Sequence, residues 1–197
     1  MTRAWPVDGL DPDAPTAENA RRILAVRMAE LFALEPAMWL ESAVRHQHDL
    51  RIAAKRLRYT LELFREEFGA SGERQIERAK ALQEVLGALH DHDVQIKLVE
   101  DELLRIGAES IAALLAEVAA TAADEVESLA TTALRPPPDD PRRGLLALLG
   151  REHARRRTRY RDAQRLWWQF ADEGFRADLT ALSASPVVAK DEGGASG

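Results

Sequence analysis

Apolar residues recur at spacings of three and four along most of the chain, which is the period of one side of an α-helix. The pattern starts at Thr16, after a lead-in with three prolines and no periodicity. It predicts six helical segments, over residues 16–35, 37–68, 73–106, 109–134, 142–171 and a short stretch after Gly174. No run alternates apolar and polar residues as a strand would. We therefore predict an all-α fold, an antiparallel helical bundle with a four-helix core and an additional, arginine-rich C-terminal helix.

Glycine marks two of the predicted helix ends. Gly69, with Ser71 and Gly72 behind it, is expected to stop the helix over 37–68, and Gly107 is expected to stop the next one. Gly87 lies in the middle of a predicted helix, where glycine costs about 1 kcal/mol relative to alanine. Its position indicates a close approach of another helix or a local distortion.

The predicted organisation is one helical domain over residues 16–182 with a segment on either side. We expect residues 1–15 to form a disordered lead-in and residues 183–197, which are rich in small residues, to form a disordered tail. Four prolines within residues 135–141 mark a linker inside the domain.

The 197 residues include 33 acidic and 27 basic side chains, which gives a formal net charge of −6, and no cysteine. The lack of cysteine excludes disulfides, thiolate metal sites and cysteine nucleophiles. No apolar run reaches the length of a membrane span, and the first residues lack the apolar core of a secretory signal. We expect a cytoplasmic protein. The acidic net charge, taken alone, disfavours a polyanionic ligand.

The charges are distributed unevenly along the chain. Residues 45–58 carry five basic side chains and one acid, and residues 142–165 carry nine arginines and two acids. Residues 100–128 show the reverse, with eight acids and one arginine. The protein is therefore acidic on average and strongly basic in two segments.

The first basic segment gathers its cations on one side of a helix. Four side chains fall within an arc of about 80° at 100° per residue: His48, Arg51, Lys55 and Arg58. The predicted core side is separate and consists of Leu50, Ala53, Ala54, Leu57, Leu61, Phe64 and Phe68. The ladder of cations is about 15 Å long, which suits a chain of phosphates better than a compact anion. A solvated charged face is the alternative, but like charges at i,i+4 repel unless an anion offsets them.

The third predicted helix contains a cluster of histidine and aspartate, residues 90–93. On a regular helix His92 shares the apolar side, whereas His90 points about 160° away, so the two imidazoles cannot chelate one ion. We predict that His92 is a hydrogen-bonded core histidine and that His90 contacts an anion at the surface. We predict neither a metal site nor a cofactor.

The fifth predicted helix carries arginine on all sides, including Arg155, Arg156 and Arg159. This segment is the basis for an alternative function, nucleic-acid binding. The acidic net charge and the lack of a recognition motif speak against that function. Three neighbouring aromatic residues are expected to pack in the core rather than stack on bases: Trp167, Trp168 and Phe170.

Two segments together resemble the CHAD domain, the conserved histidine α-helical domain. They are HDLRIAAKRLRYTLELF (residues 48–64) and LQEVLGALHDHDV (residues 82–94). The first has the pattern His-x-x-Arg-x-x-x-Lys-Arg-Leu-Arg-Tyr, and the second Leu-Gly-x-x-x-Asp-x-Asp-Val. The resemblance extends over about residues 40–105.

The resemblance implies a helical bundle that binds inorganic polyphosphate through a basic surface and associates with polyphosphate granules. Carried over by position, the basic motif of the family falls on His48, Arg51, Lys55, Arg56 and Arg58. The following helix adds Lys80 and His90 to this set.

Members of this family typically contain a second histidine–arginine helix. The candidate in this chain is Arg156-Arg-Thr-Arg159-Tyr160, which repeats the pattern of Lys55-Arg-Leu-Arg58-Tyr59 without the upstream His and Arg. With Arg155, it completes the predicted polyphosphate-binding residues. The second half is either degenerate or supplied by a second subunit, which leaves a homodimer open.

We predict non-catalytic polyphosphate binding, because no arrangement of nucleophile and base is visible. A metal-binding His/Asp bundle is the remaining alternative, but di-metal bundles usually need inward acids and Glu-x-x-His pairs from several helices. If His48 lies among phosphates, its protonated form is favoured and binding should strengthen below about pH 6.5.

Overall fold

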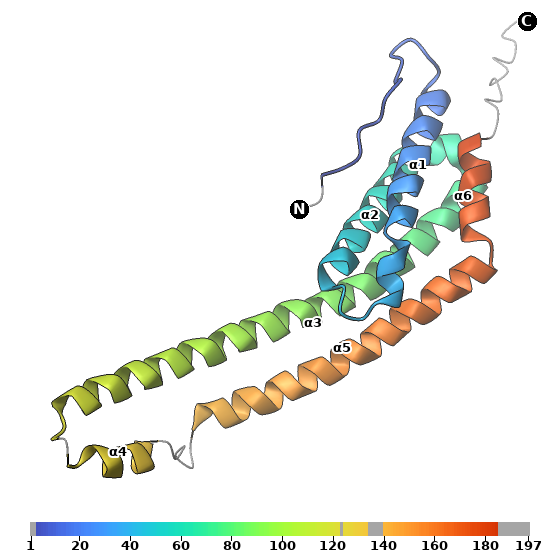
Figure 1. Cartoon of the computed structure of the whole chain (residues 1–197). Helices are drawn as coiled ribbons and strands as arrows, with labels where there is room; N and C mark the ends of the chain where they lie inside the picture. Colours follow the sequence, from blue (N-terminus) through green and yellow to red (C-terminus); the bar gives the residue numbers. More distant parts are fainter. Residues whose placement is uncertain (1–2, 123, 134–139, 185–197) are drawn as a thin grey trace, which may run out of the picture. The chain divides into compact units, whose positions relative to one another are not determined.

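The computed structural model describes residues 3–122, 124–133 and 140–184, and the regular secondary structure of these residues is helical throughout (Figure 1). The elements are α1 (Thr16–Ala33), the 3-10 helix η1 (Glu35–Trp39), α2 (Val44–Leu63), α3 (Arg65–Ala120), α4 (Val126–Ala133), α5 (Pro141–Asp172) and α6 (Phe175–Ala184). The predicted all-α class is confirmed. The described residues form two compact units, 3–90 with 159–184 and 91–158, which we call the first and the second unit.

One hydrophobic core holds the first unit together. It is built by α1, η1, α2, the beginning of α3, the end of α5 and α6, and it includes Leu24, Met38, Leu50, Leu57, Leu61, Leu82, Trp167 and Leu179. α1 packs against both α2 and α6. The side of α2 that its periodicity assigned to the core is buried from Leu50 to Leu61. This burial directs the opposite side of α2 outward.

The lead-in before α1 has no regular secondary structure and is attached to α1 by hydrogen bonds. The Nδ2 group of Asn19 donates to the carbonyl oxygen of Asp11 at 2.6 Å, and the Nη2 group of Arg27 donates to that of Trp5 at 3.0 Å. Arg22 donates to the carbonyl oxygen of Gly9. Side chains of α1 thus satisfy carbonyl groups of a segment that has no ladder of its own.

The single helix predicted over residues 37–68 is wrong, because the chain leaves helical geometry between η1 and α2 and again at Phe64, between α2 and α3. Between η1 and α2 the backbone is non-helical, and the buried amide of Gln47 donates to the carbonyl oxygens of Leu40 at 2.8 Å and Ala37 at 3.3 Å. At Gly69 the backbone has φ 55° and ψ −149°, a conformation that is accessible essentially to glycine alone. The predicted break at Gly69 is confirmed.

The end predicted at Gly107 is also wrong. α3 continues to Ala120, so residues 109–120 belong to α3, and α4 covers only 126–133 of the helix predicted over 109–134. Leu103, Ile106 and Leu114 continue a half-buried stripe on both sides of Gly107. Packing along this stripe outweighs the helix penalty of one glycine, about 1 kcal/mol. Residues 134–139, which hold most of the predicted linker, lie outside the described residues. Of the tail predicted from residue 183, residues 183 and 184 belong to α6, and the remainder lies outside the described residues.

Gly87 marks neither a close helix approach nor a distortion. A Cβ atom placed there would meet no atom within 4 Å, and the backbone of α3 is helical at this position. The interpretation of Gly87 as a packing glycine is therefore wrong.

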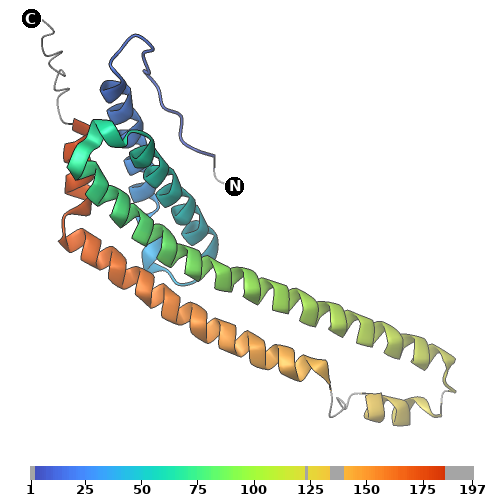
Figure 2. The same ribbon diagram turned by 180° about the vertical axis from the view of Figure 1, so that it is seen from behind.

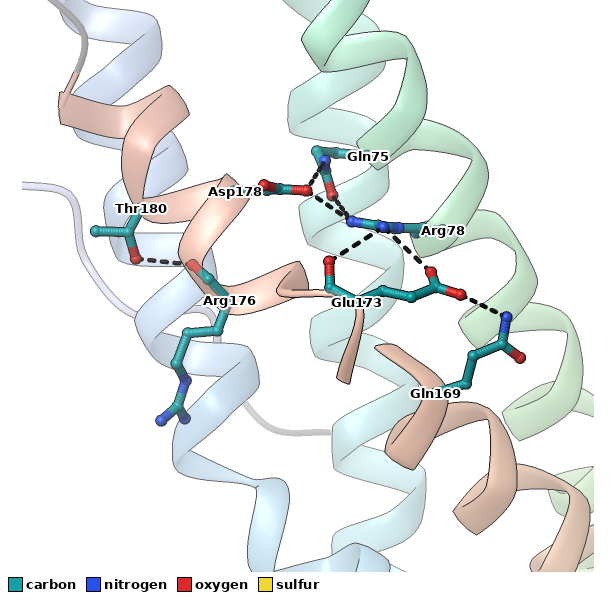
Figure 3. A network of polar contacts seen from close by, with 7 residues as sticks. All are labelled: Gln75, Arg78, Gln169, Glu173, Arg176, Asp178 and Thr180. Carbon is teal, nitrogen blue, oxygen red and sulfur yellow. Dashed lines mark hydrogen bonds and ion pairs between the residues drawn. The ribbon is translucent and has the colours of Figure 1, made fainter. Parts of the chain in front are cut away.

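Arg78 of α3 anchors α6 to the first unit (Figure 3). Its Nη1 group lies 2.8 Å from the Asp178 carboxylate, and its Nη2 group lies 3.1 Å from that of Glu173. The buried amide of Gln75 donates to the same Asp178 carboxylate at 3.2 Å. These contacts hold the beginning of α3 against the C-terminal helices.

The second unit is an antiparallel helical hairpin of α3 and α5, whose segments lie side by side in both views (Figures 1 and 2). His92 Nδ1 and Glu152 Oε2 are 2.7 Å apart, and one turn further Arg156 pairs with Asp93. Of all the helices described, none is long and apolar enough to span a membrane.

Candidate functional site

The outward side of α2 carries four half-buried basic groups in the order that the helical period requires. They are His48, Arg51, Lys55 and Arg58. The buried residues between them, among them Leu50 and Leu57, face the core. Folding thus places three permanent cations and an imidazole along one side of one helix, as predicted.

α3 meets this side of α2 through a second imidazole. The ring centroids of His48 and His90 are 4.4 Å apart, with an angle of 44° between the ring planes. Lys80, Gln83, Gly87 and His90 are spaced by three, four and three residues, so they share one side of α3. We call the combined surface the α2–α3 basic face; it consists of His48, Arg51, Lys55, Arg58, Lys80, Gln83 and His90.

Several buried polar atoms on the α2–α3 basic face have no hydrogen-bond partner among the described residues. They are Nδ1 of His48, Nε of Arg51, Nε of Arg58 and Oε1 of Gln83. A buried polar group without a partner costs about 1–3 kcal/mol, so native proteins leave few of them.

Few acidic side chains lie near the cations of this face. In the described part of the chain, no carboxylate lies within 4 Å of Arg51 or Lys55, and the closest one to Arg58 is Glu62, at 3.7 Å. Lys55 Nζ and Arg58 Cζ instead lie 5.4 and 4.9 Å from the ring centroid of Tyr59. An aromatic face attracts a cation without cancelling its charge, so the positive charge remains directed at solvent.

Arg56 has a different environment from its neighbours on α2. Its Nη1 group lies 2.5 Å from Oε1 of Glu30 on α1, and Arg27 holds the other carboxylate oxygen at 2.8 Å. The Glu30 side chain is only 2% exposed. Arg56 therefore joins α2 to α1 and is not part of the α2–α3 basic face, although the sequence placed it among the ligand-binding residues.

The three α5 arginines predicted to bind the ligand each have an acidic partner. Arg155 donates to Glu152 at 2.8 Å, the buried Arg156 pairs with Asp93, and Arg159 donates to Asp162 at 3.3 Å. Arg155 and Arg156 belong to the second unit. The site described here is thus confined to α2 and the beginning of α3.

His92 is the hydrogen-bonded histidine that the sequence predicted. Its partner Glu152 is buried, and the hydrogen bond from His92 lowers the pKa of the Glu152 carboxyl below its usual value, with a smaller contribution from Arg155. Within the described residues, no group of three or more histidine and acidic side chains is arranged to hold a metal ion.

Comparison with known proteins identifies the family. The sequence model of the CHAD domain matches residues 2–100, about half of the chain. This chain belongs to the CHAD domain family. The matched residues include the whole α2–α3 basic face, whereas α5 lies outside them. No curated protein and no solved structure matches the chain.

Sequence reasoning missed two side chains of this CHAD domain surface. Gln83 lies on the same side of α3 as Lys80 and His90, and the three-residue step from Lys80 could have identified it. Tyr59 is 46% exposed and in contact with two cations of the face. Its position directly after Arg58 was visible, but its ring orientation depends on tertiary packing.

Two of the three α5 aromatic residues pack in the core of the CHAD domain protein, as predicted. Trp167 and Phe170 are buried, and the indole N–H of Trp167 donates to Glu35 at 3.0 Å. Trp168 differs, because it is 58% exposed and contacts Trp39 with a centroid distance of 5.0 Å.

Proposed function

We propose that the protein binds inorganic polyphosphate on the α2–α3 basic face and does not catalyse a reaction on it. The observation that carries this proposal is the row of half-buried cations on one side of α2, where Arg51 and Lys55 have no carboxylate within 4 Å among the described residues. Phosphate oxygens accept charge-assisted hydrogen bonds from such groups, and arginine can offer two parallel donors to one phosphate. The polyphosphate association of the CHAD domain family supports the same ligand.

The dimensions of the face favour a linear polyanion over a single phosphate. From His48 to Arg58 the cations extend over about 15 Å of helix, calculated from the rise per residue. A compact anion could contact only one or two turns of this ladder. A chain of phosphates can contact every turn, and on α3 it can continue past His90 toward Lys80.

The chemistry of the face supports binding without catalysis. It consists of cations, imidazoles and one amide, with the Tyr59 ring beside Lys55 and Arg58, and the hydrogen bonds described for it include none between a histidine and a hydroxyl that would mark a nucleophile–base pair. In a cell, such binding would recruit the protein to cytoplasmic polyphosphate granules.

A titration with fluorescently labelled long-chain polyphosphate tests this function. We expect the double variant Arg51→Gln/Arg58→Gln to bind at least tenfold more weakly, because each lost charged hydrogen bond is worth about 1.5–3 kcal/mol. The affinity of the wild-type protein should fall linearly with salt on logarithmic axes.

The matched control is Arg22→Gln/Arg74→Gln, which removes the same charge from exposed positions of α1 and α3 outside the face. Circular dichroism and thermal melting establish that both variants fold. Equal affinity of wild type and the Arg51/Arg58 variant would refute the site. The charge-reversing Arg51→Glu/Arg58→Glu variant provides a second, stronger measurement.

A further inference from the structure

The second unit leaves a strip of large apolar side chains uncovered. Leu104, Ile111 and Leu115 of α3 are 70%, 60% and 64% exposed, and Leu146 of α5 is 58% exposed. Spacings of seven and four residues put the three α3 side chains on one face of the helix. We call these four residues the apolar strip.

The apolar strip borders a hollow between the two helices of the hairpin. Ile111 and Leu146 line this hollow together with Gly107 and Leu114, and its volume is about 650 Å³. A layer of two helices buries only the stripes that face each other, so each outer flank stays in contact with water unless another layer covers it. An exposed apolar patch of this kind is characteristic of an interaction surface.

The two helices that flank the strip have opposite charge. Between residues 100 and 120, α3 carries Glu100, Asp101, Glu102, Glu109 and Glu117 against Arg105. Between residues 141 and 158, α5 carries Arg142, Arg143, Arg151, Arg155, Arg156 and Arg157 against Glu152. Because these helices run antiparallel and side by side, the strip has an acidic helix on one side and a basic helix on the other.

Some of these charges have no ion-pair partner among the residues that the structure describes. Among the described residues, Arg151, Arg157 and the carboxylate of Glu117 form no ion pair, and Glu117 lines the hollow beside the strip. Glu117 is therefore available to a partner that approaches the apolar strip, and the two arginines leave the basic helix α5 with charge that this unit does not neutralise by an ion pair among the described residues.

We propose that a second copy of this chain packs on the apolar strip, so that two hairpins form a four-helix bundle. A two-fold axis parallel to the helices places α3 of each copy against α5 of its partner. Acidic residues then face arginines twice across the same interface. A two-fold axis that placed α3 on α3 would instead oppose acid with acid. This inference goes beyond the proposed function and does not depend on it.

Sedimentation velocity on the full chain tests the dimer. We expect the wild-type protein to sediment with twice the mass of one chain, and Ile111→Glu/Leu115→Glu to sediment as a monomer with an unchanged helical circular dichroism spectrum. The control variant Leu63→Glu alters an equally exposed leucine, 76% accessible, in the first unit and should remain dimeric.

A charge exchange tests the pairing of α3 with α5. Arg151→Glu/Arg157→Glu and Glu100→Lys/Glu117→Lys should each lose the dimer when alone, and an equimolar mixture of the two variants should recover it. A mixture that stays monomeric, although the wild-type protein dimerises, would overturn this orientation.

A monomeric wild-type chain would overturn the proposal itself. If the chain is monomeric and Ile111→Glu/Leu115→Glu lowers its melting temperature, the strip is covered by a segment of the same chain, such as α4. Polyphosphate affinity measured in the same samples reports on the proposed function separately, because the α2–α3 basic face lies in the first unit.

Discussion

Arg51 and Arg56 lie five residues apart on α2 and have opposite environments. The Nε group of Arg51 has no hydrogen-bond partner among the described residues, whereas Arg56 contacts the buried carboxylate of Glu30. A buried carboxylate left without its partners costs about 3–5 kcal/mol, so Arg27 and Arg56 are required to keep Glu30 inside. The same residue type thus stabilises the fold at Arg56 and, on the proposed function, contacts the ligand at Arg51.

Glu152 gives a pH-dependent contribution to stability. Its pKa is lowered from the ordinary value of 4.5, first by the hydrogen bond with His92 and then by Arg155. A carboxyl group with a lowered pKa in the folded state stabilises the protein above its unfolded-state pKa, and this contribution disappears as the pH falls through the folded-state pKa. We expect Glu152→Gln to be less stable than wild type at pH 7. As the pH falls below 4.5, the free energy of unfolding should decrease less in this variant than in the wild-type protein.

Urea unfolding at pH 7 and at several values below pH 4.5 measures this difference. Glu84→Gln, which neutralises an exposed acid of α3, is the control and should follow the wild-type pH dependence. Parallel pH curves for wild type and Glu152→Gln would show that the carboxylate has no such effect.

The positions of the four basic groups on α2 could be predicted from the sequence, because angles around a helix depend only on the number of residues between them. The partner of Arg56 could not. Glu30 lies on another helix, 26 residues earlier, and the contact depends on how α1 packs against α2. The same limit applies to the ion pairs of Arg155 and Arg156, which were predicted to contact the ligand.

At the scale of the helix, Gly87 and Gly107 form a matched pair. Both lie inside α3, and a Cβ atom at either position would meet nothing within 4 Å. Each alanine variant should raise the free energy of unfolding by about 0.5–1 kcal/mol, because alanine favours the helix.

The two variants should differ in binding. Gly87 lies between Gln83 and His90 on the α2–α3 basic face, so a methyl group there occupies the surface that phosphates approach. We expect Gly87→Ala to weaken polyphosphate binding severalfold and Gly107→Ala to leave it unchanged, as measured by the same titration. Unchanged affinity in Gly87→Ala would show that the ligand does not reach this turn of α3.

The ends of the helices were the least predictable part of the fold. A glycine inside a helical pattern has the same local penalty at Gly69 and at Gly107. The chain turns at the first, where φ is positive, and continues through the second, where the half-buried stripe of α3 extends on both sides. Only the packing partners distinguish these cases, and they are distant in the sequence.

At the scale of the whole molecule, we expect the formal net charge of −6 to disfavour the binding of duplex DNA more than the binding of polyphosphate. Exposed charges act over a Debye length of about 8 Å at physiological ionic strength, so the local face dominates for a thin chain that lies directly on it. Duplex DNA is wide and rigid, so it brings more phosphates near a protein whose net charge is negative.

We therefore expect polyphosphate to displace duplex DNA of equal phosphate content in a fluorescence polarisation competition at about 0.15 M salt. The difference in affinity between polyphosphate and DNA should be independent of DNA sequence, because contacts to phosphates alone carry no sequence information. Equal or stronger binding of DNA under these conditions would favour a nucleic-acid-binding function over the proposed one.

The buried Nε groups of Arg51 and Arg58 lack a hydrogen bond among the described residues, although Glu62 lies 3.7 Å from that of Arg58, and they link the proposed ligand binding to folding. Without an anion, each buried N–H group lowers the stability of the native state by about 1–3 kcal/mol. On the proposed function, polyphosphate binds the folded state only, so it should raise the melting temperature by an amount that grows with the logarithm of its concentration above the Kd. Replacement of Arg51 by an apolar residue of similar shape should therefore raise the melting temperature and lower the affinity for polyphosphate. Stability would increase at the expense of the proposed function.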